Sequence, residues 1–469
     1  MLQIEKSDNW SKNIFSNADL GDKRRTKRLI SIGSQLSANI GSSLVKSCEG
    51  DEGKLEGIYR FLRNNKVEPQ KIAESGFFAT VNQAFKCKTL LALEDTTTLG
   101  YTHSLKNSLG DLGGNKESTK RGYLVHNVLM LDAQSEQTIG LIEQNYWLRA
   151  LDSDGRAKKR KSRNYEEKES FKWEEASQRV ATRLGEKMTD VISVCDREAD
   201  VYEYLHYKHC AQHRYIVRAS YNRKLKGGHF IFDHADTAPV LGYYDIKIPQ
   251  KGGRTERNTI LELRAMTVKI LPPKRKVTYG EELTINLVIA EEKYTPDGKG
   301  LCWMLLTEEP IDSFEKARQI TRYYELRWRV EDFHKAWKSG GTGVEALRLQ
   351  ATDNLKRTAI IMAFVAVRLI QMREIFSLAN KKTEQSIPCD QLLDKEEWQT
   401  LWITREKRPL PDKVPSVVWA YNSIARLGGW TDSKKTGIVG WRTLWDGWFR
   451  LQDKVDGMLA AMSILESKT

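Results

Sequence analysis

Two short apolar runs, each ending in an aspartate, constrain the fold of this chain more than any other feature. The first run, KTLLALED, ends at Asp95, and the second, DVISVCD, ends at Asp196. Runs of this length and composition are typical of buried β-strands. A segment of helical pattern, ESFKWEEASQRVATRLGEKM, precedes the second run. Alternating strands and helices favour an α/β fold, in which groups at the ends of neighbouring strands meet at the ligand-binding edge of the sheet.

The pattern changes along the chain and predicts three regions. The first 70 residues have helical spacing, with Asp22 as an expected N-cap before Leu29, Ile32 and Leu36. Strand-like runs begin near residue 85, and β-type runs separated by Gly and Pro fill residues 221 to 310. The pattern therefore predicts a helical region at 1–70, strands from about residue 85 and a β-rich insert at about 221–310.

The charge and the apolar pattern limit the possible partners. The 469 residues carry a net charge of +13, which favours anionic partners such as nucleic acid, acidic lipid or phosphorylated substrates. The chain has no run of 18 apolar residues and no apolar signal core near its start, so we expect a soluble cytoplasmic protein without a membrane partner. Its six cysteines are scattered without a C-x-x-C pair, which predicts reduced thiols.

The stretch YYELRWRVEDFHKAWKSGG, residues 323 to 341, places an acid among cations. Wound as one α-helix, it brings five side chains within roughly 80° of one another: Tyr324, Arg327, Glu331, Lys335 and Lys338. One interpretation is a surface helix with i,i+4 ion pairs from Arg327 to Glu331 and from Glu331 to Lys335. The other is a carboxylate that binds a metal, beside cations that hold a polyanion.

The two strand-end aspartates are possible partners for the acid of this helix. An aspartate at a strand end is also a common turn or capping residue, so each one alone is a weak signal. Asp95, Asp196 and Glu331 brought together would repel one another unless cations neutralised them. Hard oxygen ligands select Mg²⁺ or Mn²⁺. Two such ions about 3.5–4 Å apart can activate an attacking hydroxyl and stabilise a leaving oxygen in phosphodiester transfer, while nearby cations hold phosphates.

Three segments that contain these acids resemble the carboxylate motifs of the bacterial insertion-sequence DDE transposases of the Tn5 type: LEDTT, VCDREAD and YYELRWRVEDFHKAWKSG. The signature of this family, Tyr-x2-Arg-x3-Glu-x6-Lys, is matched at every spacing by Tyr324, Arg327, Glu331 and Lys338. The segments YRFLRNN, PDGKGLCWMLLTEEP and WAYNSIARLGGWTDSKKTGIVGW extend the resemblance over essentially the whole chain.

The resemblance implies an RNase H-like catalytic core at 71–372, interrupted by the β-rich insert at about 221–310. It also implies a helical N-terminal domain at 1–70 that binds transposon ends and a helical C-terminal dimerisation domain at 373–469. It implies cut-and-paste transposition through nicked and hairpin DNA, with two Mg²⁺ ions per active site and Mn²⁺ as a substitute. The implied partners are double-stranded DNA, both terminal inverted repeats and target DNA, and a second copy of the chain in a DNA-bound homodimer. The implied location is the bacterial cytoplasm, in association with the nucleoid.

The resemblance also implies roles for individual residues. Asp95, Asp196 and Glu331 match the metal-binding catalytic triad. Other matched positions, together with Lys335 beside them, imply DNA contacts: Tyr324, Arg327 and Lys338 at the transposon end, Trp303 with Tyr244 and Arg218 around a flipped base, and Arg28 and Arg60 in the N-terminal domain. By its sequence context alone, Trp303 in CWMLL is more typical of a core residue. Ala38, Asn39 and Val45 depart from the family at DNA-contacting positions, which predicts a different terminal sequence.

Two other functions are consistent with some of these sequence features. A non-transposing RNase H-like endonuclease would use the same three carboxylates, and a strand-transfer assay separates it from a transposase. A DNA-binding-only regulator would explain the positive charge without the carboxylates, and it predicts no metal-dependent nicking.

Overall fold

The computed structural model describes residues 6–48, 50–102, 105, 108–113, 121–149, 163–248, 257–273, 282–293, 300–338, 341–381, 387–431 and 439–467. The chain divides into two compact units. We call one the sheet unit, which comprises Thr80–Thr97 and Leu124–Glu331. The other is the helical unit, which comprises Met1–Ala79, Thr98–Tyr123 and Asp332–Thr469. The domain boundaries predicted at residues 70, 221, 310 and 372 remain predictions.

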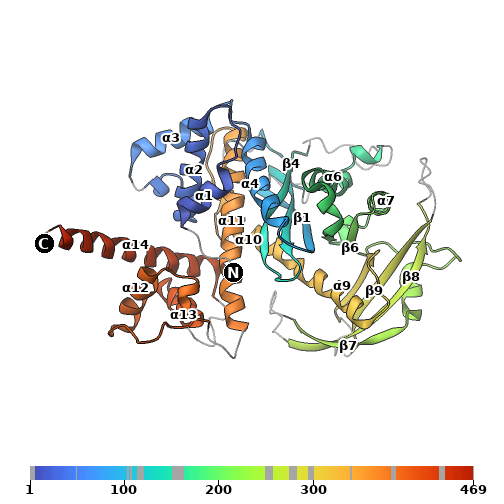
Figure 1. Cartoon of the computed structure of the whole chain (residues 1–469). Helices are drawn as coiled ribbons and strands as arrows, with labels where there is room; N and C mark the ends of the chain where they lie inside the picture. The colour runs from blue at the N-terminus through green and yellow to red at the C-terminus, as the bar shows by residue number, and fades with distance from the viewer. Residues whose placement is uncertain are drawn as a thin grey trace. The chain divides into compact units, whose positions relative to one another are not determined.

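The sheet unit is built on a large mixed sheet (Figure 1). Its strands follow the order β3-β1-β5-β6-β10-β9-β8-β7, with β4 paired to β3. Strands β1, β5 and β6 run parallel, and β6 to β7 are joined by antiparallel pairs through β10, β9 and β8. The strands are β1 (Leu90–Tyr101), β3 (Arg121–Asp132), β4 (Thr138–Trp147), β5 (Val191–Cys195), β6 (Arg214–Arg218), β7 (Val240–Ile248), β8 (Arg257–Ile270), β9 (Leu283–Glu292) and β10 (Cys302–Thr307).

Helices cover the sheet through apolar faces. Helix α6 (Lys172–Leu184) places Ala176, Val180 and Leu184, at i,i+4 spacing, in a buried cluster with side chains of β1, β3, β4 and β5. Helix α7 (Tyr202–Cys210) contributes to a second cluster that extends under β6 and β9. The remaining helices of this unit are α8 (Ile231–His234), α9 (Phe314–Leu326) and the start of α10 (Trp328–Trp337). Short 3-10 helices span Tyr165–Glu167, Glu169–Phe171, Gly185–Asp190, Arg197–Ala199 and Ala235–Thr237.

The helical unit contains both ends of the described chain. Asp22 caps its second helix as predicted, because its carboxylate accepts a hydrogen bond of 2.8 Å from the backbone N–H of Arg24. The long helix α11 (Thr352–Lys381) brings Phe364 against the rings of Phe15 and Phe77. Its other helices are α1 (Ser7–Phe15), α2 (Lys23–Ala38), α3 (Glu52–Leu62), α4 (Pro69–Ala84, up to residue 79), α12 (Lys395–Glu406), α13 (Val417–Leu427) and α14 (Trp441–Glu466). Shorter elements are β2 (Gly110–Asp111) and 3-10 helices at Lys46–Cys48, Val344–Ala346 and Cys389–Gln391.

The mixed α/β class with helical ends is therefore confirmed, with one correction and one feature that the sequence did not predict. Strand β1 does not end at Asp95 as predicted but continues to Tyr101. The strands predicted in the insert are present, but they extend the same sheet, because β10 pairs directly with β6 from Leu305↔Arg218 to Thr307↔Ile216. This pairing joins segments more than 80 residues apart, so no local pattern predicts it.

Two predictions that concern the whole chain can also be compared with the structure. All six cysteines are free. Among the described residues, no helix has both the length and the apolar composition needed to cross a membrane.

Candidate active site

Two aspartates lie at the same edge of the sheet. The parallel register of β1 and β5 runs from Leu90↔Val191 to Glu94↔Cys195, and Asp95 and Asp196 are the next residue of each strand. Neighbouring strands are about 4.8 Å apart, so the register brings the two carboxylates close together. The carboxylate of Asp95 accepts a hydrogen bond from the N–H of Thr96, and that of Asp196 from the N–H of Glu198, each of 2.8 Å.

The third acid, Glu331, lies in the first turn of α10, just after a break between α9 and α10. The single helix predicted for residues 323 to 341 is interrupted at Arg327, which lies between Leu326 at the end of α9 and Trp328 at the start of α10. The N–H of Arg327 bonds to the carbonyl of Tyr324, and the N–H of Val330 to the carbonyl of Arg327, each at 3.1 Å. Both bonds span three residues, which is the tighter spacing of a 3-10 turn.

Arg327 connects two of the three acids. Its Nη2 donates to Oε1 of Glu331 at 2.8 Å, and its Nη1 lies 3.5 Å from Oδ2 of Asp95. The Arg327 side chain is only 9% exposed. Water and salt therefore weaken its attraction to the two acids less than they would at an open surface. The i,i+4 pair of Arg327 and Glu331 predicted from the sequence is present, but it belongs to a cluster of acids rather than to an open helix surface.

Burial and neighbouring acids raise the proton affinity of Asp95 in this cluster. Burial raises the pKa of Asp95 to about 6; the carboxylates of Asp196 and Glu331 add to the rise, and Arg327 opposes it. Burial also raises the pKa of Asp196. Burial alone would lower the pKa of Arg327, but Tyr324 and the three carboxylates outweigh it and raise this pKa. The site therefore holds acidic charge that a single guanidinium does not fully neutralise.

The chemistry of the cluster suits a hard cation, although its present arrangement is that of an ion pair. Its donors are carboxylate oxygens, the ligands that Mg²⁺ and Mn²⁺ prefer. Among the described residues, no three His, Cys, Asp or Glu side chains are positioned to share a metal ion. Arg327 supplies the positive charge next to Glu331 and Asp95 instead. Repulsion from Asp196 and Glu331 adds to the raised pKa of Asp95, and a divalent ion between these carboxylates would relieve it.

Three residues predicted to contact DNA lie together in the sheet unit. The rings of Trp303 on β10 and Tyr324 on α9 meet edge to face, with centroids 5.5 Å apart. Arg218, at the end of β6, donates from Nη2 to the carbonyl of Cys302 at 2.9 Å, next to Trp303. Trp303 is 6% exposed, as its sequence context alone indicated. Its ring therefore has little surface open to a base in this conformation.

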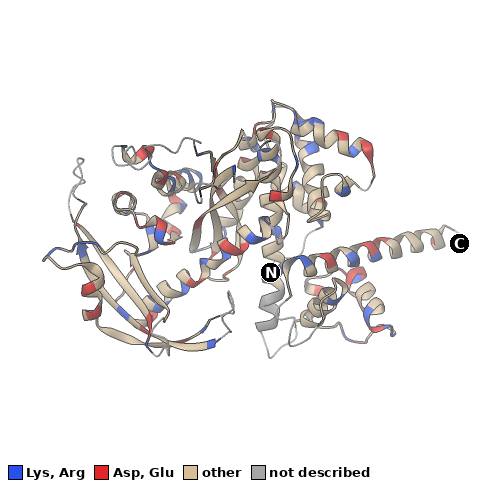
Figure 2. Ribbon diagram, turned by 180° about the vertical axis from the view of Figure 1, so that it is seen from behind, with Lys and Arg blue, Asp and Glu red and all other residues tan. Residues whose placement is uncertain are grey.

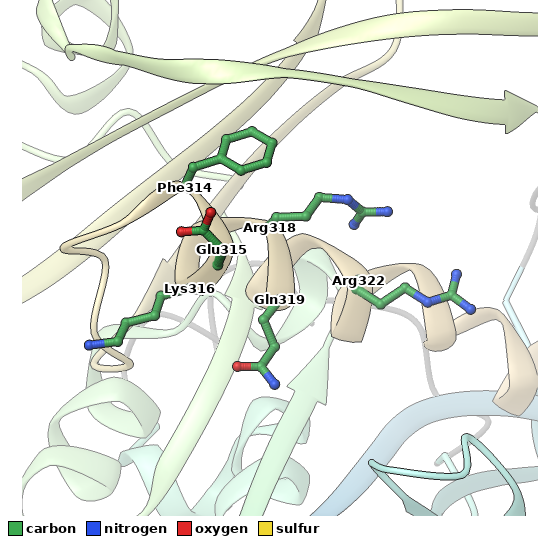
Figure 3. A pocket seen from close by; sticks show the side chains of 6 residues that line it. All are labelled: Phe314, Glu315, Lys316, Arg318, Gln319 and Arg322. Carbon is green, nitrogen blue, oxygen red and sulfur yellow. The ribbon is translucent and has the colours of Figure 1, made fainter.

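Tyr244 lies apart from this group. Trp303 pairs with Ala290, Ala290 with Leu263, and Leu263 with Gly242, so the residue level with Trp303 on β7 is Gly242. Three strand spacings separate the two positions, about 14 Å. Tyr244 instead contacts α9, where the guanidinium carbon of Arg318 lies 4.1 Å from its ring centroid. Arg318 also lines a hollow along α9, together with Phe314, Glu315, Lys316, Gln319 and Arg322 (Figure 3).

Lys335 and Lys338, the other predicted DNA contacts in residues 323 to 341, belong to the helical unit. Lys335 is 61% exposed and lies 3.6 Å from Asp332, rather than forming the expected pair with Glu331. Lys338 lies 3.5 Å from Glu345, which also accepts a 2.8 Å hydrogen bond from the N–H of Gly100.

Arg28 and Arg60 share a surface of the helical unit. Both are exposed, Arg28 on α2 and Arg60 on α3. The guanidinium of Arg28 lies against α3, because a Cβ at Gly57 would be 2.7 Å from its Nη1. Arg60 follows Gly57 by one helical turn and pairs with Glu56 at 3.8 Å. Lys and Arg gather in the first half of α2, at residues 23 to 28, so this surface carries several cations (Figure 2).

Three residues near the site were not identified from the sequence. Trp328 is 43% exposed, and the guanidinium of Arg327 lies 5.6 Å from its ring centroid. Glu94 and His126 are buried polar residues on β1 and β3, beside Asp95 in the sheet. A signal for the last two was available, because each interrupts an otherwise apolar strand, in LLALED and in GYLVHNVLMLD.

Comparison with known families adds two matches. The transposase DNA-binding family matches residues 7–67, which include α1, α2 and α3. The transposase Tn5 dimerisation domain matches residues 369–468, which include the end of α11 and α12 to α14. The two matches lie at opposite ends of one chain, and together they support a transposase of the Tn5 type.

Proposed function

We propose that this chain is a DNA transposase that binds the ends of its element, nicks and excises it through hairpin intermediates, and joins it to target DNA by metal-dependent phosphodiester transfer. One observation carries the catalytic part of this proposal: Asp95 and Asp196 follow the last paired residues of β1 and β5, and Arg327 links Asp95 to Glu331. The strand order β4-β3-β1-β5-β6, with β1, β5 and β6 parallel, supports an RNase H-like core.

In this proposal Asp95, Asp196 and Glu331 hold two Mg²⁺ ions, which Mn²⁺ can replace. The ions would activate the attacking oxygen and stabilise the leaving oxygen of the phosphodiester. Arg327 neutralises part of the acidic charge of Glu331 and Asp95 while no ion is bound. The same guanidinium would also be suited to hold a DNA phosphate, since a guanidinium binds phosphate and carboxylate in the same forked geometry.

The DNA contacts that we propose lie in both units. Arg28 and Arg60, within the matched DNA-binding region, would contact the transposon end. Four residues of α9, α10 and their junction would hold the cleaved strand: Tyr324, Arg327, Lys335 and Lys338. Trp303 and Arg218 would support an unstacked base, and the exposed ring of Trp328 offers a further stacking surface beside Arg327. Tyr244 would contact DNA beside α9, where its ring lies against Arg318.

A homodimer is proposed through the C-terminal region. The second half of α14 carries exposed apolar side chains: Leu459, Met462, Ile464 and Leu465. This half of the helix extends beyond α12 and α13 in the helical unit (Figure 1). The same residues lie within the matched dimerisation region at 369–468. Exposed apolar surface of this kind is typical of a protein–protein contact.

A plasmid assay tests the proposal against the two alternatives. The substrate is supercoiled DNA that carries the inverted repeats flanking the reading frame, with Mg²⁺ and a second plasmid as target. We expect nicked, hairpin-ended and joined products in turn. Nicking without any joined product would indicate an endonuclease, and specific binding without nicking would indicate a regulator.

A further inference from the structure

His126 contacts the residues on both sides of Asp95. It lies fully buried on β3, and its Nδ1 is 3.0 Å from Oγ1 of Thr96. Its Nε2 is 3.5 Å from Oε2 of Glu94. Side chains alternate between the two faces of a strand, so Glu94 and Thr96 share one face of β1 and Asp95 points to the other. One imidazole therefore reaches both neighbours of Asp95 from behind.

Asp95 lies just beyond the part of β1 that pairs with β5. The pairing of the two strands ends at Glu94↔Cys195, so Asp95 is the first residue of β1 beyond this parallel register. The carboxylate of Asp95 accepts a hydrogen bond from the N–H of Thr96, so the position of Thr96 affects that of the carboxylate. A contact that fixes residues 94 and 96 from the opposite face would define where Asp95 points.

The imidazole itself is held by its surroundings. The ring of Trp173 on α6 meets it edge to face, with centroids 4.6 Å apart. Burial lowers the pKa of His126, although Glu94 opposes this effect, and the ring is therefore neutral near pH 7. A neutral imidazole has one N–H and one acceptor. Nδ1 is within hydrogen-bond distance of the Thr96 hydroxyl, whereas Nε2 lies near the Glu94 carboxylate without forming a hydrogen bond to it.

Glu94 interacts electrostatically with one fixed polar group, the ammonium of Lys208. It is buried at the end of the paired segment, and its charge supports the protonated form of Lys208, whose pKa burial lowers. The Nζ of Lys208 donates to the hydroxyls of Ser177 at 2.7 Å and Ser193 at 2.8 Å. These bonds join α6, α7 and β5 behind the edge that carries Asp95 and Asp196.

We infer that His126 is a positioning residue for Asp95: by holding Glu94 and Thr96 from the inner face of the sheet, it presents the Asp95 carboxylate to the metal site. The inference depends on the proposed function, because it assumes that Asp95 is a metal ligand. It assigns His126 no contact with DNA or metal. Residues that orient metal ligands through hydrogen bonds typically change metal affinity by 10–100-fold when they are replaced.

Binding of Mn²⁺ to the full-length protein in complex with its end DNA, measured by electron paramagnetic resonance, tests this inference. We expect His126→Leu, which removes both contacts, to weaken Mn²⁺ binding about tenfold or more. His126→Asn keeps a polar group near the position of Nδ1, and we expect it to recover part of the loss. Thr96→Val removes only the hydroxyl and should weaken binding in the same direction. Val180→Ala, in the core cluster under α6, is the matched control: it should lower stability but leave Mn²⁺ affinity unchanged.

The outcomes separate the inference from the proposed function. If Asp95→Ala binds Mn²⁺ like the wild type, Asp95 is not a ligand and the proposed function itself is wrong. If Asp95→Ala loses the ion while His126→Leu and Thr96→Val keep wild-type affinity, only the positioning role is wrong, and the buried cluster serves stability alone. Should His126→Leu fail to fold, Thr96→Val decides the question by the same criterion.

Discussion

Nη1 of Arg327 lies 3.5 Å from Oδ2 of Asp95, although 232 positions separate the two residues in the chain. The same guanidinium donates to Glu331 through Nη2. A nearly buried cation between two acids indicates that the acids would repel one another without it. Arg327 therefore stabilises this cluster of acids, and in the function proposed above a bound ion would take over the same neutralising role.

Removing Arg327 should destabilise the metal-free protein. Arg327→Ala leaves partly buried carboxylates without their cation, and loss of one partner of a buried ion pair typically costs about 3–5 kcal/mol. Urea unfolding at pH 8 in a chelator measures the effect. Lys335→Ala is the control, because this exposed lysine should change stability by less than about 0.5 kcal/mol. Equal stability of both variants would show that Arg327 is not needed to neutralise the acids.

The pKa of Asp95 predicts how stability depends on pH. Its folded value of about 6 lies above its ordinary value of 3.8, so its contribution to stability is fully present below pH 3.8 and is lost as the pH rises through about 6. Asp95→Asn remains uncharged and should be more stable than the wild type at pH 8, by at most about 3 kcal/mol. The gain should shrink between pH 6 and pH 4. A difference in unfolding free energy that stays constant over pH 4–8 would contradict a raised pKa.

The surface formed by Arg28 and Arg60 should contribute to end binding through charge. Each phosphate contact adds about 0.9 to the slope of log affinity against log salt, so Arg28→Ala and Arg60→Ala should each weaken binding and reduce this slope by about one. If Arg28 also reads a base, discrimination against the wrong sequence should fall by about 1–3 kcal/mol. Lys71→Ala on α4, outside the matched DNA-binding region, is the control. Unchanged slopes in both arginine variants would mean that the cations are only solvated.

Trp303 should affect both stability and the hairpin step. Trp303→Ala removes a nearly buried ring and should cost about 3–5 kcal/mol of stability, so rates must be compared where both proteins are folded. Under those conditions we expect near-normal nicking and slower hairpin formation, since an aromatic surface contributes about 1–3 kcal/mol per stacked base. An abasic site at the flipped position should partly rescue the variant. Equal slowing of both steps would assign Trp303 to the core alone.

The features that were predicted correctly from the sequence are those whose pattern involves only neighbouring positions in the chain. The apolar runs before Asp95 and Asp196 and the i,i+4 spacing of Arg327 and Glu331 are short-range patterns, and the strands and the ion pair are present. The cap formed by Asp22 is local in the same way.

The features that the sequence did not predict depend on contacts between distant segments. Strand β1 continues beyond Asp95 because Leu99 and Tyr101 are also buried. The separation of Tyr244 from Trp303 follows from the registers of β7 to β10, which span residues 240 to 307. The role of His126 depends on packing between β1, β3 and α6, so its position in an apolar strand indicated only that it needed a partner.

The most direct test of the three-carboxylate site is metal-dependent nicking of DNA that carries the element's own ends. We expect Asp95→Ala, Asp196→Ala and Glu331→Ala to abolish nicking to a similar degree, singly or combined, while end binding stays near wild type, because loss of any ligand disables a shared site. Glu315→Gln, an exposed acid in the first turn of α9, should nick normally. A Glu331→Ala protein that nicks its ends at the wild-type rate would contradict the assignment.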